Sequence, residues 1–196
     1  MSAVRIVSAA ELRAHVRFED LIEPIAAAFR DSSAGLADNG LVMMFPLERR
    51  DRGDVYVKTG TLQGHCIFIV KVSPWFAANV ERGDAQGGFI AVFDSHTGHT
   101  IALLNDEHYL SDIRTAAAGA LAARALTPGS VQTASVLGAG VQAYWQTLAL
   151  HRERTFKRLL IWARSRDKAL ALKRRIKLFN SSALSALFLF WSPSRR

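Results

Sequence analysis

The spacing of apolar and polar positions predicts two helices near the start of the chain. Ser8 and Glu11 form the S-x-x-E pattern of a capping box, so a short helix is expected to begin after Ser8. A second helix is predicted from about Asp20, where Pro24 is tolerated because it falls in the first turn. Its apolar face consists of Leu21, Ile22, Ile25 and Phe29. The polar, glycine-containing stretch 31–40 then predicts a loop.

Four runs rich in β-branched and aromatic residues follow. The runs are 55–58, 67–72, 89–93 and 100–104. The first two flank a turn at 60–64 and the last two flank a turn at 94–98, which is typical of hairpins. Two successive hairpins predict a mainly antiparallel sheet backed by the early helices.

The last part of the pattern alternates between helix and strand. An alanine-rich helix is predicted over 113–126 and ends before Pro128. The run 131–137 predicts a buried strand, and apolar residues at helical spacing follow from Val141. The run 158–162 predicts a second strand, which completes a β-α-β unit.

A glycine-rich turn joins the first of these strands to its helix. Residues 138–143 fit G-x-G-x-x-A, the phosphate turn of dinucleotide-binding folds. Gly138 is expected to make the tight turn, Gly140 to let the backbone approach a pyrophosphate, and Ala143 to let helix and strand pack closely. Ordinary glycine turns also fit this pattern, but the flanking strand and helix favour a dinucleotide site, because a helix N-terminus attracts phosphate.

The end of the second strand bears on the choice of cofactor. An NAD site usually has an acidic residue there, whereas this chain has Arg164 and Ser165. A guanidinium suits a 2′-phosphate and a hydroxyl adds a donor, so NADP is favoured over NAD. The alternative is a solvated pair of arginines, Arg164 and Arg166, and Asp167 keeps NAD open.

Composition indicates an ordinary globular protein, with 49% hydrophobic and 21% charged residues. The single cysteine, Cys66, excludes an internal disulfide or a cysteine metal cluster, and it is expected to pack as a small apolar residue. The start of the sequence lacks a signal peptide's apolar core, and no apolar run is long enough for a membrane span. We therefore expect a cytoplasmic protein without a membrane or nucleic-acid partner.

Two lysines are candidates for chemistry. Lys71 stands in an otherwise apolar strand, where burial would lower its pKa toward the range useful for proton transfer. Lys58 ends the neighbouring predicted strand, so the two could share a face and attract an anionic carboxylate. The alternative for Lys71 is a strand-end lysine that reaches solvent.

Other polar residues are weaker candidates. Arg114 falls in the first turn of the predicted alanine-rich helix, where the helix dipole disfavours a cation unless it reaches an anion. The alternative is a solvated arginine. Asp94, His96 and His99 cluster in a turn but lack metal-ligand spacing, and turn chemistry explains them better. No metal site is predicted.

These residues together carry a resemblance. Lys71, the hairpin FIAVFDSHTGHTIALL, the helix RTAAAGALAA and the turn SVLGAGVQA resemble the ornithine cyclodeaminase/mu-crystallin family from about residue 5 to residue 172. The resemblance implies an α/β protein with two domains and a homodimer. Residues 1–127 are then an α+β substrate-binding and dimerisation domain with a mainly antiparallel sheet, and 128–172 an incomplete Rossmann-type dinucleotide-binding domain.

The resemblance also implies roles for particular residues. Lys71 matches the family's acid/base lysine, and Arg114 matches the arginine that holds the substrate carboxylate, with Lys58 as a further substrate contact. The residues expected to contact NADP or NAD are Thr115, Gly138, Ala139, Gly140, Val141, Gln142, Arg164 and Ser165. A second carboxylate-binding arginine, frequent in the family on an early strand, is absent from 43–46, and the candidates to replace it are Lys58 and Arg49.

The end of the chain departs from the family. Residues 1–150 hold 12 basic and 15 acidic side chains, whereas 151–196 hold 13 basic and 2 acidic ones. Residues 173–196 are interpreted as a divergent or out-of-frame tail, and the later Rossmann strands and an assisting aspartate are expected to be missing. The alternative is a genuine basic amphipathic tail that binds an acidic partner or a membrane. Its apolar side would be Leu184, Leu187, Phe188 and Trp191.

Two classes of function follow from the resemblance. The first is an enzyme that converts ornithine to proline and ammonia through an imine, or that reduces a cyclic imine or ketimine, or that dehydrogenates an amino acid. The second is an inactive protein that keeps nucleotide contacts without catalysis. Whether this chain is itself an enzyme is left open by the sequence.

Overall fold

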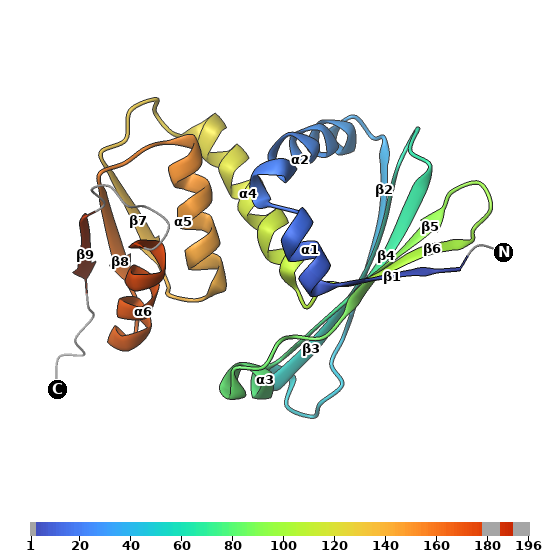
Figure 1. Ribbon diagram of the computed structural model, residues 1–196, viewed down its shortest axis with the longest axis horizontal. Helices are drawn as coiled ribbons and strands as arrows, with labels where there is room; N and C mark the ends of the chain where they lie inside the picture. Colours follow the sequence, from blue (N-terminus) through green and yellow to red (C-terminus); the bar gives the residue numbers. More distant parts are fainter. Residues whose placement is uncertain (1–2, 178–184, 190–196) are drawn as a thin grey trace. The chain divides into compact units, whose positions relative to one another are not determined.

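The chain folds into two compact units in the computed structural model, which describes residues 3–177 and 185–189 (Figure 1). The first unit contains residues up to 17 together with 23–111. The second contains residues 18–22 and the chain from 112 onward. Each unit has its own sheet, so the α/β fold class is confirmed.

The first unit is built on a six-stranded sheet with the order β1-β6-β5-β4-β3-β2. The strands are β1 (Arg5–Ser8), β2 (Ala37–Met44), β3 (Gly53–Leu62), β4 (Ile67–Phe76), β5 (Phe89–Asp94) and β6 (Thr100–Asn105). Only the β1–β6 pair is parallel, and the others are antiparallel. The two hairpins and the mainly antiparallel sheet are therefore confirmed.

Helices accompany this sheet. They are α1 (Ala9–His15), most of α2 (Phe18–Ser33), the short 3-10 helix η1 (Arg50–Arg52) and α3 (Ala77–Arg82). Helix α4 (Tyr109–Leu126) follows, and its residues from Asp112 onward belong to the second unit. The capping box that begins α1 is present, because the Ser8 hydroxyl accepts from the Glu11 N–H and the Glu11 carboxylate accepts from the Ser8 N–H. Helices α1 and α2 lie on one side of the sheet, as expected (Figure 1).

Several boundaries differ from the sequence expectation. Helix α2 begins at Phe18, so Pro24 lies inside it and not in its first turn. Strand β2 occupies part of the predicted loop 31–40, because pairing with β3 overrides the low strand propensity of its polar residues. The predicted turn at 60–64 starts too early, since Gly60 lies within β3.

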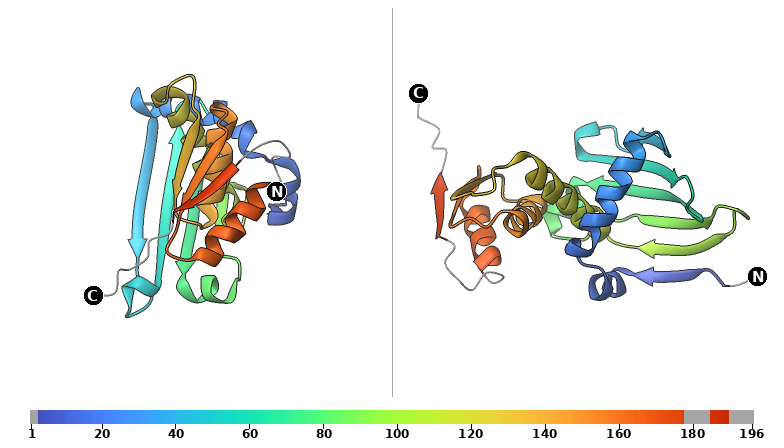
Figure 2. Two further views of the ribbon diagram at one scale, coloured as in Figure 1. Left: turned by 90° about the vertical axis from the view of Figure 1, so that its left-hand side faces the viewer. Right: turned by 90° about the horizontal axis from the view of Figure 1, so that it is seen from above.

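The second unit has a three-stranded parallel sheet with the order β7-β8-β9. Its elements after α4 are β7 (Thr133–Leu137), α5 (Val141–Glu153), β8 (Arg158–Trp162), α6 (Arg166–Lys177) and β9 (Ser185–Leu189). Strand β9 lies beside β8 (Figure 2, left). This alternation of strands and helices is the first half of a Rossmann-type arrangement.

The third strand corrects the expectation for the end of the chain. Only two strands were expected in this sheet, but Ser185–Leu189 pairs with all of β8. A short apolar run fits a buried strand as well as a helix, and pairing decides between them. Leu187 and Phe188 thus fall on a strand, not on a helical tail, whereas Leu184 and Trp191 lie outside the described residues.

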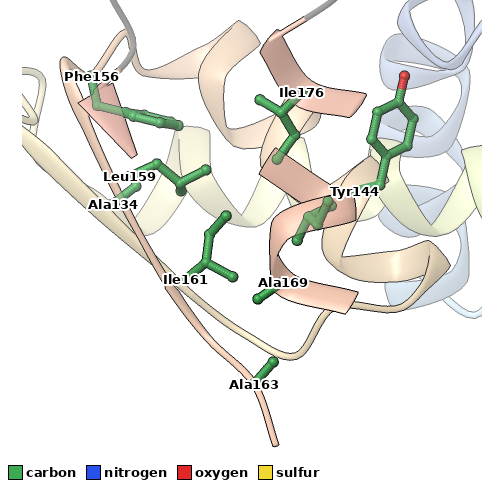
Figure 3. Close-up of a cluster of buried hydrophobic side chains, with 9 residues drawn as sticks. Ala134, Tyr144, Phe156, Leu159, Ile161, Ala163, Ala169 and Ile176 are labelled. Carbon is green, nitrogen blue, oxygen red and sulfur yellow. The ribbon is translucent and has the colours of Figure 1, made fainter. Parts of the chain in front are cut away.

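The core of the second unit fills the space between sheet and helices. Side chains from β8 and α6 point toward one another (Figure 3). Its members are Ala134, Tyr144, Phe156, Leu159, Ile161, Ala163, Ala169, Leu172 and Ile176. Leu159 and Ile161 are at most 1% exposed, so β8 is the buried centre of the sheet and fixes the two loops at its ends.

Candidate functional site

The phosphate turn has the conformation that its glycines predict. Gly138 has φ of 121°, a left-handed value that residues with a side chain rarely adopt, and its N–H donates to the Trp162 carbonyl at 2.8 Å. Gly140 is the N-cap of α5 with an ordinary φ of −88°. A Cβ built at Gly140 would meet no atom within 4 Å, so the backbone there is open to a ligand.

A cavity of about 780 Å³ opens at this turn, within the second unit. Its lining comes from the turn, the end of β8 and one face of α6: Gly138, Ala139, Gly140, Val141, Trp162, Ala163, Arg164, Ser165, Lys168, Ala171, Leu172 and Arg175. Three of these described residues are cations and none is a carboxylate. The cavity therefore favours an anionic ligand, and its open backbone turn fits a dinucleotide diphosphate.

Arg164 and Ser165 occupy the predicted position at the end of β8. Arg164 is exposed, and the Ser165 hydroxyl accepts from the Lys168 N–H at 3.4 Å, which caps α6. A hydroxyl that accepts still has its own proton to donate. Ser165 can therefore hold the helix and donate to a ligand phosphate at the same time.

Two lining cations were missed by the sequence analysis. Lys168 and Arg175 are seven residues apart, so they project from one face of α6 toward the cavity. The Arg175 guanidinium lies 3.7 Å from the centre of the Tyr144 ring, a cation–π contact that holds it in place. Burial raises the pKa of Tyr144, and the nearby charge of Arg175 opposes that shift. Helical spacing after β8 could have found both cations, but Lys168 was not singled out in the predicted segment 128–172, and Arg175 was assigned to the tail 173–196.

Gln142 and Thr115 are placed differently from the other predicted cofactor residues. Neither of these described residues lines the cavity. The Gln142 amide donates to Asp112 at 2.9 Å, and the Gln146 amide donates to the Thr115 carbonyl at 2.9 Å. These bonds tie α5 to α4, so their contact with a cofactor stays a prediction.

The lysine pair of the first unit is confirmed as a pair on one face. Lys58 and Lys71 are directly opposite each other in the β3–β4 register, and opposed residues of antiparallel strands share a face. Both are half-buried, and the Lys71 ammonium donates to the Ser111 hydroxyl at the start of α4. Lys58 lies in the middle of β3 and not at its end, because β3 continues to Leu62. Their roles in substrate binding and proton transfer stay predictions.

Arg114 lies in the second turn of α4, not in the first. The helix starts at Tyr109, four residues before the predicted start. Arg114 is exposed and belongs to the second unit, whereas Lys71 belongs to the first. The dipole argument for an anion at Arg114 is therefore weaker, and its role rests on the resemblance.

Several other expectations can be compared with the structure. Cys66 is exposed in the turn between β3 and β4, so its prediction as a packed apolar residue is wrong. Arg49, a possible stand-in for a carboxylate-binding arginine, is paired with Asp51 at 2.7 Å. Asp94 accepts from the N–H groups of His96 and Thr97, which confirms turn chemistry and lowers the pKa of Asp94.

Over residues 3–177 and 185–189, no group of three or more His, Cys, Asp or Glu side chains could hold a metal ion. Within the same ranges, none of the helices is both long enough and apolar enough to cross a membrane.

Known proteins resemble most of the chain. The uncharacterized cyclodeaminase y4tK of Sinorhizobium fredii is 40% identical over 192 residues, which cover 95% of this chain and 57% of that protein. The ketimine reductase mu-crystallin of Mus musculus is 27% identical over 173 residues, 85% of this chain and 54% of that protein.

A solved structure has the same fold. The Δ1-pyrroline-2-carboxylate reductase of Thermococcus litoralis, in complex with NADH and L-proline, superposes with a TM-score of 0.85 at 21% identity, covering 94% of this chain and 57% of that one. The present chain thus spans just over half the length of the proteins that it matches. The family description "Ornithine cyclodeaminase/mu-crystallin family" matches residues 3–186, and the chain belongs to this family.

Proposed function

We propose that this chain carries the substrate domain and the first half of the cofactor domain of an NADP(H)-dependent enzyme acting on an imine or amino acid carboxylate. The observation that carries the proposal is the cavity at Gly138–Val141, whose open turn and three cations suit a phosphorylated dinucleotide. When bound, such a cofactor accepts or supplies hydride at the substrate's α-carbon.

The cation set favours NADP over NAD. Arg164 and Ser165 stand where an NAD site usually has a carboxylate, and Lys168 adds a second charge to the same cavity. A charge-assisted hydrogen bond contributes roughly 1.5–3 kcal/mol, or about tenfold to a hundredfold in affinity. The Thermococcus litoralis reductase was solved with NADH, so the NADP preference proposed for this chain differs from the cofactor in that structure.

The lysine face of the first unit bears on the substrate. A carboxylate is attracted by Lys58 and Lys71, which oppose each other in the sheet. The side-chain ammonium of ornithine would be repelled by the same pair. The positive charge of the two lysines therefore favours reduction of a cyclic imine carboxylate, such as a pyrroline-2-carboxylate, over cyclodeamination of ornithine.

The chain's residues have defined tasks in this reaction. Lys71, held by Ser111, moves a proton to or from the substrate nitrogen, and Lys58 attracts the carboxylate. Arg114 is expected to hold the carboxylate, by analogy with the family. Cyclodeamination of ornithine stays the second candidate, because the y4tK relative is named a cyclodeaminase.

The test titrates the full chain with NADPH and NADH while following nicotinamide fluorescence. NADPH should bind at least tenfold more tightly, and Arg164→Asp should remove that preference. Arg174→Asp is the matched control, because Arg174 is exposed on α6 and does not line the cavity. Absence of saturable binding by either dinucleotide would contradict the proposal, and turnover assays with a cyclic imine and with ornithine then rank the two reactions.

A further inference from the structure

The turn before α4 is strained. Glu107 has φ of 47° and His108 has φ of 65°, and among the described residues these are the non-glycine positions with positive φ. A residue with a side chain is strained in this region, and the conformation persists only where its surroundings hold it. Two such residues in succession call for a reason beyond connecting β6 to α4.

The residues around the turn hold it in this conformation. Asp106 is 2% exposed, and its carboxylate accepts from the Leu110 N–H at 3.1 Å while its carbonyl accepts from the Tyr109 N–H at 2.7 Å. The Tyr109 hydroxyl donates to the Val16 carbonyl at 2.6 Å. The turn is thus fixed by a buried carboxylate on one side and by the end of α1 on the other.

The strained conformation brings the His108 ring to strand β4. Its Nε2 lies 2.9 Å from the Pro74 carbonyl oxygen and 3.2 Å from the Ser73 hydroxyl. A carbonyl oxygen can only accept, so Nε2 carries the hydrogen. The Ser73 hydroxyl oxygen then accepts the second branch of a bifurcated hydrogen bond from Nε2–H. The hydroxyl proton of Ser73 must therefore be donated in another direction. His108 therefore fixes Ser73 as a donor.

Ser73 lies on the face that carries the lysine pair. It is two residues from Lys71 on β4, and residues at that spacing share a face about 7 Å apart. Its partner across the β3–β4 register is Tyr56, next to the Lys58–Lys71 pair. Lys71 and Ser73 both reach the same segment, through Ser111 and His108 respectively.

We propose that Ser73 donates a hydrogen bond to the substrate carboxylate and that His108 is the positioning residue that orients this donor. The proposal rests on the proposed function and adds a determinant to its substrate site. Two ammonium groups supply attraction but little direction, because each is a rotating point charge. A hydroxyl with a fixed proton supplies direction, so it selects the tilt of a planar ring carboxylate above the sheet.

The experiment measures the binding of pyrrole-2-carboxylate to the full chain by calorimetry, in the presence of NADPH. This planar probe has a ring carboxylate. Ser73→Ala removes the donor and should weaken binding about tenfold, since hydrogen bonds to charged groups contribute on this scale. His108→Gly should weaken binding similarly, because Ser73 is then no longer forced to donate.

The thermal midpoint separates a positioning role from a structural one. His108→Gly loses the bond to Pro74 but relieves the strained φ, so the midpoint should change little while binding falls. ¹⁵N NMR of the unmutated chain should show the Nε2–H tautomer of His108. Ser95→Ala and His96→Asn, in the exposed β5–β6 turn, are the matched controls and should bind the probe normally.

The outcomes distinguish this inference from the proposed function. If the unmutated chain binds the probe and Ser73→Ala binds it equally well, the inference is wrong and the substrate site stands. An Nδ1–H tautomer, or a fall in binding that only tracks loss of the fold, would also overturn it. If the unmutated chain does not bind the probe, the substrate assignment of the lysine face fails first.

Discussion

The two units build their proposed anion sites in opposite ways. In the second unit the site begins with backbone: a glycine turn between β7 and α5 leaves the backbone open to a ligand, and three cations line the space around it. In the first unit the site consists of side chains on a sheet, where Lys58 and Lys71 meet through the β3–β4 register. Local sequence specifies the first kind of site, whereas long-range pairing specifies the second.

The comparison predicts that the two sites can be damaged independently, and the largest effect is expected at Lys71. Lys71→Met keeps the length and the apolar stem but removes the titrating group. Imine turnover should fall roughly a hundredfold to ten-thousandfold, as is typical when an acid/base group is lost. NADPH affinity and the thermal midpoint should hardly change, because the phosphate turn belongs to the other unit. Unchanged turnover would show that Lys71 is not the acid/base group.

The two glycines of the phosphate turn should respond differently to the same substitution. Gly140→Ala has an allowed φ and open space, so it should weaken NADPH binding more than tenfold without loss of stability. Gly138→Ala is strained at φ of 121° and should lose about 1–3 kcal/mol of unfolding free energy as well. Fluorescence titration and thermal unfolding of both variants check this pair. Equal stability of the two variants would contradict the conformational reason given for Gly138.

The smallest effect is expected from an ion pair in the second unit. Arg124 contacts Glu153 at 2.9 Å and 3.0 Å, and the hydrogen bonds from Arg124 lower the pKa of Glu153. A lowered pKa means that the stabilisation is present above the ordinary glutamate pKa and is lost as pH falls through the folded-state value. Arg124→Met should therefore lower the unfolding free energy by about 0.5–1 kcal/mol at neutral pH.

The measurement is the unfolding free energy over a pH series. The difference in this free energy between Arg124→Met and the unmutated chain should shrink in acid. Arg82→Met is the control from the first unit. Arg82 also contacts a carboxylate, Asp84 at 2.6 Å, but both side chains are more than half exposed. Solvent screens such a pair, so no difference should be measurable at any pH. A constant loss for Arg124→Met across the series would indicate lost packing instead of lost charge.

The features that could be predicted from the sequence are those specified by local residues, as in the comparison of the two units. The G-x-G-x-x-A turn and the strand Arg158–Trp162 are specified by neighbouring residues, and both were predicted with the bounds that the structure has. The hairpins were predicted for the same reason. The fold class and the family could also be predicted, because the motifs occur in a fixed order along the chain.

The elements and residues that could not be predicted depend on contacts between distant parts of the chain. Strand β1 pairs with β6 across nearly a hundred residues, and β2 is polar at its start, so neither was predicted. The start of α4 was predicted too late. The turn before it contains a buried Asp106 and two residues of positive φ, which no local pattern indicates. Arg175 was assigned to the tail, because its contact with Tyr144, which lies on a different helix, is not visible in the local sequence.

The cations around the cavity of the second unit also have a kinetic consequence. Arg164, Lys168 and Arg175 surround an open space, and none of the described residues that line it is a carboxylate that would neutralise them. Such a field acts over about 8–10 Å at ordinary ionic strength, well beyond hydrogen-bond range. It raises the local concentration of dinucleotide anions before any contact forms, so the rate of encounter depends on salt while the bound geometry does not. Under the proposed function, the charged face of α6 would guide the cofactor toward the glycine turn as well as hold it there.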